Sequence, residues 1–423
     1  MNVLKWIRNN DFVFNVSKLI TGTALGQLIT LLFSPILTRL YTSDDFGILA
    51  VYFSVASILS VVITLRLDMA VVLPNDDHEA VDLVILGMIV SFLLSFFLLI
   101  IIMIFSNHIY TIIGHPELGF YLYLVPLSTF FYGTYQMLSY WNSRIKKFNQ
   151  LAISKTVKEM STGIIQLNMG VIYYVGALGL VLGQIAGNAG AASYLFAKVF
   201  NQLRARIIIG ILKNLGLVFQ KYKKFPLYTS WTSLVSSISQ NIPAILLAFL
   251  YSPATAGFYA VATRVLTVPS VLIGDSVRQV YYQKASALNN QGESIINIFR
   301  KSTLYLSLIA ITPIGIIIIW GEPLFRIVFG PTWGEAGLFA SILSIWLFFS
   351  FMNPPSTVTV LIMGLNRLQL ILELLLLIFR VIAIAAGYIF YNDVLMSLLF
   401  FSIIGAIYQI SFITFIYVRL KKS

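Results

Sequence analysis

Residues 17–74 read SKLITGTALGQLITLLFSPILTRLYTSDDFGILAVYFSVASILSVVITLRLDMAVVLP. Within this stretch the polar turn YTSDD at 41–45 separates two apolar runs, 16–40 and 46–68. Each run has the length, about twenty residues, that a helix needs to cross the hydrocarbon core of a bilayer. The stretch therefore predicts two membrane-spanning helices joined by a tight turn.

The composition of the whole chain has the same character. Of 423 residues, 58% are hydrophobic and 10% are charged, whereas charged residues supply about a quarter of an ordinary soluble domain. An integral membrane protein is therefore expected. The net charge of +12 would suggest a nucleic-acid partner in a soluble protein, but the placement of Lys and Arg explains the charge better.

Further apolar runs predict an all-α integral membrane protein of about twelve helices. The N-terminus lacks a short apolar run that ends at a small-residue cleavage site, so the first helix is expected to be its own insertion signal. The predicted spans are 16–40, 46–68, 81–105, 119–141, 152–174, 177–199, 227–250, 256–280, 301–320, 335–361, 369–391 and 394–418.

Lys and Arg gather on one side of these spans. Because cytoplasmic loops retain such residues, both termini are predicted to be cytoplasmic and the number of spans to be even. The opposite side carries only Arg39 and Arg326. The cytoplasmic set is Lys5, Arg8, Lys18, Arg144, Lys146, Lys147, Arg204, Arg206, Lys213, Lys221, Lys223, Lys224, Lys284, Arg300, Lys301, Arg367, Arg419, Lys421 and Lys422.

The longest segment between spans, 201–226, mixes basic residues with an apolar stripe. It is typical of an amphipathic linker at the membrane interface. A plain basic loop that obeys the charge asymmetry is the alternative, and lipid binding by its lysines is a further possibility. The linker divides the chain into an N-terminal lobe, 1–200, and a C-terminal lobe, 227–423.

The two halves contain an internal match at an offset of 210 residues. LYTSDDFGILAVYFSV at 40–55 aligns without gaps with LYSPATAGFYAVATRV at 250–265. Both segments join the first and second helix of a half. The match predicts two six-helix halves in parallel orientation, related by a pseudo-two-fold axis along the membrane normal. The paired identities are Leu40 with Leu250, Tyr41 with Tyr251, Gly47 with Gly257, Ala50 with Ala260, Val51 with Val261 and Val55 with Val265.

These features resemble the polysaccharide flippases of the multidrug/oligosaccharidyl-lipid/polysaccharide exporter superfamily, and the Wzx-type O-antigen transporters in particular. The similarity is carried by residues 17–74, with Pro35 inside the first helix, and by FGPTWGEA at 329–336. It implies a MATE-like, V-shaped transporter whose two lobes flank a central cavity and alternate in access. It further implies a lipid-linked oligosaccharide as cargo, a proton or Na⁺ as coupling ion, and a polysaccharide polymerase and chain-length regulator as partners.

Related lipid-precursor flippases line this cavity with arginines on helices 1, 2 and 8. Arg66 at the end of the second predicted span and Arg264 in the eighth match that pattern. The first span departs from it, because it has only Lys18 at its start and Arg39 at its outer end.

Ionisable residues inside the predicted spans indicate the transport path independently of any resemblance, because such residues usually face protein or a wet cavity. Fixed cations there replace the water around a diphosphate during its crossing. Lys155 has an alternative role as an intrahelical partner of Glu159, and Arg66 as a surface partner of Asp68. For Arg264 the alternative is an interior arginine held by backbone carbonyls, and for Arg380 it is pairing between helices. The predicted cationic ligands are Arg264, Arg66, Lys155, Lys158 and Arg380.

The carboxylates near helix interiors are the predicted ion-coupling groups, since a buried acid can bind a proton or Na⁺. Asp275 also forms an i, i+3 pair with Arg278, which favours a structural or gating role. The coupling set is Asp68, Glu159, Asp275 and Glu373.

The seventh span begins with the hydroxyl- and amide-rich sequence YTSWTSLVSSISQNIP at 228–243. Sugar hydroxyls bond readily to such groups, although small hydroxyl residues also allow close helix packing. Four residues on one face are predicted to contact cargo, namely Ser233, Ser237, Gln240 and Asn241.

The sequence predicts no cofactor. It has no cysteine and only three scattered histidines, His78, His108 and His115, and it lacks the GxxxxGK[ST] loop of ATP-driven proteins. A flippase for an undecaprenyl-diphosphate-linked oligosaccharide in the bacterial inner membrane is the first hypothesis. The alternatives are an exporter of the same fold for a peptidoglycan lipid precursor or a cationic drug, and a membrane glycosyltransferase or polymerase, for which the outer loops are too short.

Overall fold

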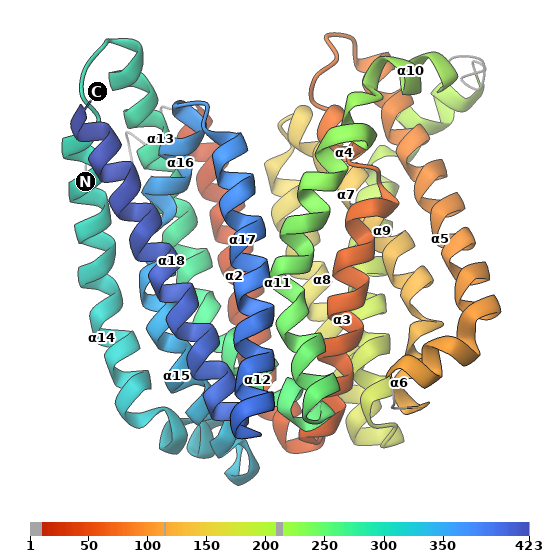
Figure 1. Ribbon diagram of the computed structural model, residues 1–423. Helices are drawn as coiled ribbons and strands as arrows, with labels where there is room; N and C mark the ends of the chain where they lie inside the picture. The colour runs from red at the N-terminus through yellow and green to blue at the C-terminus, as the bar shows by residue number, and fades with distance from the viewer. Residues whose placement is uncertain (1–10, 114–115, 209–214, 423) are drawn as a thin grey trace. The chain divides into compact units, whose positions relative to one another are not determined.

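The computed structural model describes residues 11–113, 116–208 and 215–422, and the regular structure of these residues is helical throughout (Figure 1). A helix satisfies all backbone hydrogen bonds within the spanning segment, which is necessary where the bilayer core offers no water. Helices cover every predicted apolar run, so the predicted all-α membrane class is confirmed.

Packing divides the chain into two units. Unit 1 comprises 1–41 and 48–241, and unit 2 comprises 42–47 and 242–423. Residues 42–47, which begin the second helix, therefore pack with unit 2. Residues 227–241, which form the first half of the seventh predicted span, pack with unit 1. The division into lobes at 201–226 stays a prediction.

The helices of unit 1 include a four-residue helix, α4, directly after the second span. Around α4 and the start of α5, the side chains of Leu67, Val71, Leu83, Met137 and Trp141 form the centre of a buried apolar core. The elements are α2 (Asp11–Leu40), α3 (Ser43–Ile63), α4 (Leu67–Ala70), α5 (Asp77–Ile113), α6 (Pro116–Leu122), α7 (Val125–Arg144), α8 (Phe148–Asn168), η1 (Met169–Tyr173), α9 (Ala177–Ile208), α10 (Leu215–Tyr222), η3 (Phe225–Thr229) and α11 (Ser230–Leu250).

Unit 2 is built in the same way. Its core includes Tyr281, Phe299 and Phe412, all buried. Pro354 and Pro355 open α16 and separate it from α15, because proline cannot donate the backbone hydrogen bond that would continue a helix. The elements are α12 (Pro253–Pro269), η4 (Ser270–Gly274), α13 (Asp275–Asn290), α14 (Ile296–Phe329), η5 (Pro331–Trp333), α15 (Gly334–Phe351), α16 (Pro354–Ile362), α17 (Asn366–Ala386), η6 (Gly387–Tyr391) and α18 (Val394–Lys422).

Among the described residues, ten helical segments are long and apolar enough to cross a membrane. The protein is therefore a multi-pass membrane protein. Two predicted spans are absent from these ten and correspond to α7 and α8, which carry more polar side chains than the other long helices. A total of twelve spans stays a prediction.

The predicted repeat is visible in the contacts between the starts of α3 and α12. A Cβ on Gly47 would overlap the backbone of Pro253, and a Cβ on Gly257 would overlap the backbone of Ser43. At the offset of 210 residues, Ser43 corresponds to Pro253 and Gly47 to Gly257, so the two contacts are equivalent. Such reciprocity is the mark of a two-fold relation. Glycine is required at both positions because the two backbones approach there.

Replacing Gly257 with Ala is expected to destabilise the protein by about 2 kcal/mol, because the added methyl meets backbone, which cannot move aside as a side chain can. The matched control is Gly315→Ala in α14, where a Cβ meets nothing within 4 Å. That control should be neutral or gain about 0.5 kcal/mol from helix propensity. Chemical unfolding in a mild detergent measures both variants, and equal stability of the two would contradict the close backbone contact.

Three acidic residues in the first two turns of α5 bind basic residues from three other elements of unit 1. Asp77 accepts from Arg144 of α7, Glu79 from Lys221 of α10, and Asp82 from Arg206 of α9. Arg144, Arg206 and Lys221 belong to the basic set that the sequence assigned to the cytoplasmic side. These side chains thus also hold the ends of α7, α9 and α10 against α5.

Candidate functional site

A cavity of about 620 Å³ lies within unit 1. It is bounded by α3, the turn that leads to α4, and parts of α7, α8, α9 and α11. Most of its side chains carry a hydroxyl, an amide or a charge. The lining residues are Tyr52, Phe53, Ala56, Ser57, Ser60, Val61, Thr64, Arg66, Asp68, Ser128, Thr129, Tyr132, Gln136, Lys158, Gln184, Asn188, Ser233, Ser236, Ser237, Gln240 and Asn241.

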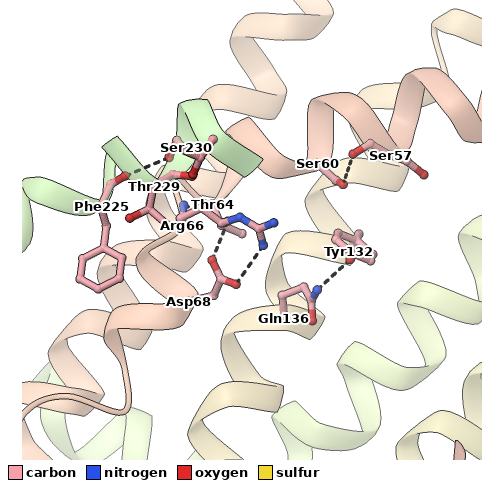
Figure 2. A network of polar contacts seen from close by, with 11 residues as sticks. Ser57, Ser60, Thr64, Arg66, Asp68, Tyr132, Gln136, Phe225, Thr229 and Ser230 are labelled. Carbon is pink, nitrogen blue, oxygen red and sulfur yellow. Dashed lines mark hydrogen bonds and ion pairs between the residues drawn. The ribbon is translucent and has the colours of Figure 1, made fainter. Parts of the chain in front are cut away.

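A left-handed turn at the end of α3 places the charged groups of the cavity. Leu65 and Arg66 have φ values of 49° and 56°, a conformation that costs energy in residues other than glycine and collects at functional sites. Thr64 stabilises the turn, since its Oγ1 accepts from the backbone N of Arg66 at 3.3 Å and donates to Oδ1 of Asp68 at 2.9 Å. Figure 2 shows Arg66 and Asp68 side by side beyond this turn.

Arg66 and Asp68 form a loose ion pair. Nη1 of Arg66 lies 3.7 Å from Oδ2 of Asp68, and the Asp68 side chain has no solvent exposure. Nε of Arg66 and Oδ2 of Asp68 are buried without a hydrogen-bond partner. Asp68 lies between the apolar spans Ser43–Ile63 and Asp77–Phe105. Burial raises the pKa of its carboxyl, against the lowering effect of Arg66 and Thr64. The pair is thus interior, and Arg66 keeps donor capacity for a further anion.

Lys158 of α8 supplies the second cation of the cavity. Its Nζ lies 6.0 Å from the ring centroids of both Tyr132 and Tyr135 on α7. Aromatic faces attract an ammonium group without neutralising it. Among the described residues, no carboxylate forms an ion pair with Lys158.

One face of α11 brings neutral polar groups to the same cavity. All four residues that the sequence predicted on this face line it, and Ser236 joins them. Ser237 Oγ donates to the carbonyl of Ser57 on α3 at 3.3 Å, and Asn241 Nδ2 donates to the carbonyl of Ser237 at 2.9 Å. The face therefore packs on α3 and also presents hydroxyls and amides to the cavity.

The remaining polar lining was not identified from the sequence. Tyr132 and Gln136 on α7 are joined by a 2.7 Å bond from Nε2 to the phenolic oxygen (Figure 2). Gln184 and Asn188 come from α9, and Asn188 is buried. Both pairs are spaced by four residues, which places each pair on one helical face. Polar residues spaced by four in otherwise apolar helices are the signal from which the sequence could have predicted these lining residues.

Two predicted residues on α8 face a different neighbour. Nζ of Lys155 donates to Oγ1 of Thr23 at 2.6 Å, and a carboxylate oxygen of Glu159 accepts from Oγ1 of Thr30 at 3.0 Å. Both partners belong to α2, and neither Lys155 nor Glu159 lines the cavity of unit 1. These two residues hold α8 to α2, whereas Lys158 points into the cavity.

The other predicted site residues belong to unit 2, so the unit 1 cavity does not include them. Arg264 is half-buried on α12, and Glu373 is half-buried on α17, where it accepts from Gln369 Nε2 at 3.0 Å. Asp275 begins α13, but its side chain lies outside the described residues, and Arg278 is exposed. The roles predicted for Arg264, Asp275 and Glu373 stay predictions.

Arg380 of α17 is held between aromatic rings in the interior of unit 2. Its Cζ lies 4.6 Å from the ring centroid of Trp346 on α15 and 4.9 Å from that of Phe401 on α18. The residue is 5% exposed, and its Nε has no hydrogen-bond partner. A planar guanidinium can stack on two rings at once, which joins α17 to both neighbouring helices.

Arg380→Lys should therefore destabilise the protein by about 2 kcal/mol, because the ammonium keeps the charge but loses the stacking. Arg367→Lys is the matched control, since Arg367 is exposed on the same helix. Thermal unfolding of the purified variants measures the difference. Equal melting temperatures would show that stacking between the rings contributes nothing to stability.

The arrangement in unit 1 can bind an anion together with uncharged polar groups. Two cations, Arg66 and Lys158, face the cavity against one carboxylate, and the hydroxyls and amides extend from them along α3 and α11. In the described part of the chain, no group of three or more His, Cys, Asp or Glu could hold a metal ion. The cavity is thus suited to a ligand with an anionic end and a hydroxyl-rich end.

The fold of the chain is similar to that of solved transporters of the MOP superfamily. A lipid II flippase, MurJ, in an inward closed conformation matches with a TM-score of 0.75 at 14% identity over 95% of this chain and 89% of that one. An inward-facing multidrug resistance MATE family transporter matches with a TM-score of 0.72 at 12% identity over 95% of both chains. A MOP superfamily transporter from Pyrococcus furiosus, described as having a binding pocket of reversed polarity, matches with a TM-score of 0.62 at 12% identity over 96% of this chain and 95% of that one.

The sequence profile of the family described as "Polysaccharide biosynthesis protein" matches residues 36–337, which is more than half of the chain. The protein belongs to that family. Comparison with curated proteins finds no match. The predicted resemblance to polysaccharide flippases and the predicted MATE-like fold are therefore confirmed.

Proposed function

We propose that this protein is a flippase that moves an undecaprenyl-diphosphate-linked oligosaccharide from the cytoplasmic to the periplasmic leaflet of the bacterial inner membrane. The oligosaccharide is the repeat unit of an O-antigen or another surface polysaccharide. The observation that carries the proposal is the unit 1 cavity, where Arg66 and Lys158 stand beside a surface of hydroxyls and amides. The family of polysaccharide biosynthesis proteins supports the cargo class.

The cavity would act by replacing water around the headgroup. The diphosphate takes charge-assisted bonds from Arg66 and Lys158, which are about twice as strong as neutral hydrogen bonds. The sugar hydroxyls bond to Ser233, Ser237, Gln240 and Asn241 of α11. The prenyl chain needs no polar partner and stays in the lipid. Alternating access of the cavity to the two leaflets then completes the transfer without covalent chemistry.

Uphill transfer needs coupling to an ion gradient, and Asp68 is the carboxylate that the unit 1 cavity offers for it. Its buried Oδ2 has no hydrogen-bond partner and could accept a proton. Protonation would also release Arg66 for the diphosphate. A polymerase and a chain-length regulator would receive the product at the periplasmic side.

A cationic drug is the second candidate cargo, because MATE transporters share the fold. The balance of two cations to one carboxylate in the cavity disfavours it. A peptidoglycan lipid precursor is the third candidate cargo. It carries the same diphosphate as the proposed cargo and differs from it in the sugar and peptide part.

Depletion of the protein in its host tests the proposal. Surface polysaccharide should be lost, while the lipid-linked repeat unit accumulates in the cytoplasmic leaflet and sensitivity to cationic dyes stays unchanged. Normal surface glycan together with raised dye sensitivity would instead establish a drug exporter. Arrested cell-wall synthesis with normal surface glycan would indicate the peptidoglycan precursor.

A further inference from the structure

The α10 helix presents an apolar and basic surface that the other residues described by the structure leave exposed. Its inner face is buried, since Val218 and Tyr222 join the apolar core. Its outer face exposes Leu217 at 67% and Phe219 at 38%. In Figure 1, α10 lies at the end of the helix bundle beside the start of α5. The exposed Leu217 and Phe219 make the outer face of this short helix apolar.

The residues that follow α10 continue this surface. Lys223 and Lys224 are exposed, and Leu227 and Trp231 are exposed at 57% and 65%. Lys221 is different, because its Nζ is already bonded to Glu79 of α5. Among the described residues 215–231, Lys223 and Lys224 are therefore the exposed cations with no carboxylate in an ion pair.

The neighbouring spans fix the depth of the surface. The apolar span of α9 ends at Arg204, and that of α11 begins at Ser230. Leu227 and Trp231 thus lie at the start of a membrane span, where Trp is enriched at the headgroup level. A short amphipathic helix between two span ends, with lysines beside exposed Leu, Phe and Trp, has the composition of a segment that lies in the membrane interface.

We infer that Leu217, Phe219, Lys223, Lys224, Leu227 and Trp231, which we call the α10 surface, dock on anionic phospholipid headgroups of the leaflet that α10 faces. The apolar side chains enter the boundary of the acyl chains, and the two lysines bind phosphate oxygens above it. This binding uses a surface other than the cargo cavity and does not depend on the identity of the cargo.

Lipid docking at this surface has a direct path to the cavity. The η3 turn, which joins α10 to α11, packs on α4, and α4 carries Asp68. The carbonyl of Phe225 in η3 accepts from Ser230 Oγ at 3.3 Å, at the start of the helix that supplies the neutral polar face of the cavity (Figure 2). Docking of α10 on an anionic leaflet would thus fix the position of η3, which contacts both α4 and α11 of the cavity.

A single spin label reports the docking, because the chain has no cysteine and Phe219→Cys introduces a unique thiol. The labelled full-length protein is placed in nanodiscs of phosphatidylcholine alone and of an equal mixture with phosphatidylglycerol. In the mixture, we expect relaxation of the label by oxygen to exceed relaxation by a water-soluble nickel reagent. Lys223→Gln with Lys224→Gln should reduce the equilibrium constant for docking by about fivefold for each lysine removed.

The matched control is Arg419→Gln with Lys421→Gln, which removes the same charge from exposed positions of unit 2. The control should leave the label at position 219 unchanged, and a label at Gln291→Cys, in an exposed turn, should stay aqueous in both nanodiscs. The inference is overturned if the label at 219 is aqueous in both lipids, as a surface that awaits a protein partner would be. It is also overturned if the Lys223/Lys224 variant and the Arg419/Lys421 control change the relaxation of the label equally, because the effect would then come from the net charge of the protein.

Discussion

Replacing both Arg66 and Lys158 with Gln should reduce export of the surface glycan by at least about 100-fold, because each lost charge-assisted bond is worth at least about 1.5 kcal/mol. Both side chains line the unit 1 cavity, and neither forms a tight ion pair with a described residue: Arg66 lies 3.7 Å from Asp68, and Lys158 lies beside the rings of Tyr132 and Tyr135. Each single variant should lose about tenfold. Surface-glycan immunoblots of complemented cells, at matched protein abundance, measure the effect.

Lys155→Gln is the matched comparison for Lys158→Gln. The two lysines are three residues apart on α8, but Lys155 donates to Thr23 of α2 and does not line the cavity. We expect export by the Lys155 variant to stay within about threefold of wild type, because Lys155 does not line the cavity and its bond to Thr23 is partly exposed. An equal loss of export in the two variants would mean that the role of each lysine does not depend on whether it lines the cavity.

Asp82→Asn should destabilise the protein by about 2 kcal/mol, because it breaks a partly buried ion pair whose carboxylate is buried and leaves Arg206 without its partner. Oδ1 and Oδ2 of Asp82 accept from Nε and Nη2 of Arg206 at 2.6 and 2.8 Å, and the Asp82 side chain is 3% exposed. The pair joins the start of α5 to the end of α9. Chemical unfolding in a mild detergent gives the change in the free energy of unfolding.

Asp77→Asn provides the control on the same helix. Asp77 also accepts from an arginine, Arg144, but its side chain is 71% exposed. An exposed ion pair contributes at most about 1 kcal/mol, so this variant should remain close to wild type. If Asp77→Asn were as destabilising as Asp82→Asn, burial would not be the source of the difference.

The fold could be predicted from the sequence because each of its determinants is local. A bilayer accepts only long apolar helices, so the runs of hydrophobic residues give the helices directly. The repeat could be predicted from a short match around Gly47 and Gly257, since close backbone contact tolerates no side chain there. The predicted spans that hydropathy does not confirm are α7 and α8, which carry cavity residues such as Tyr132, Gln136 and Lys158.

The site could be predicted in part. The hydroxyl face of α11 and the cations Arg66 and Lys158 were found because polar residues in an apolar span are conspicuous. Sequence spacing could not assign different roles to Lys158 and Lys155, because residues three positions apart lie close together on a helix. Which of them reaches the cavity depends on how the neighbouring helices pack against α8. The burial of Asp68 depends on the left-handed turn at Leu65 and Arg66, which no glycine marks.

The α5 ion pairs were missed for a different reason. Asp82 and Arg206 are 124 residues apart, and nothing in the local pattern joins them. The assignment of the basic residues to the cytoplasmic side rests on their distribution between loops, which requires no knowledge of their partners, and it stays a prediction. Pairing over such separations is a property of the packed helices.

The central claim is that the cations of the unit 1 cavity hold a diphosphate headgroup during transfer. The most direct test is translocation of a fluorescent undecaprenyl-diphosphate-linked oligosaccharide in proteoliposomes, read by quenching of the fluorophore from one side of the membrane. We predict transfer by the wild-type protein and by Lys155→Gln, and none by the Arg66→Gln, Lys158→Gln double variant. Undiminished transfer by the double variant would contradict the account.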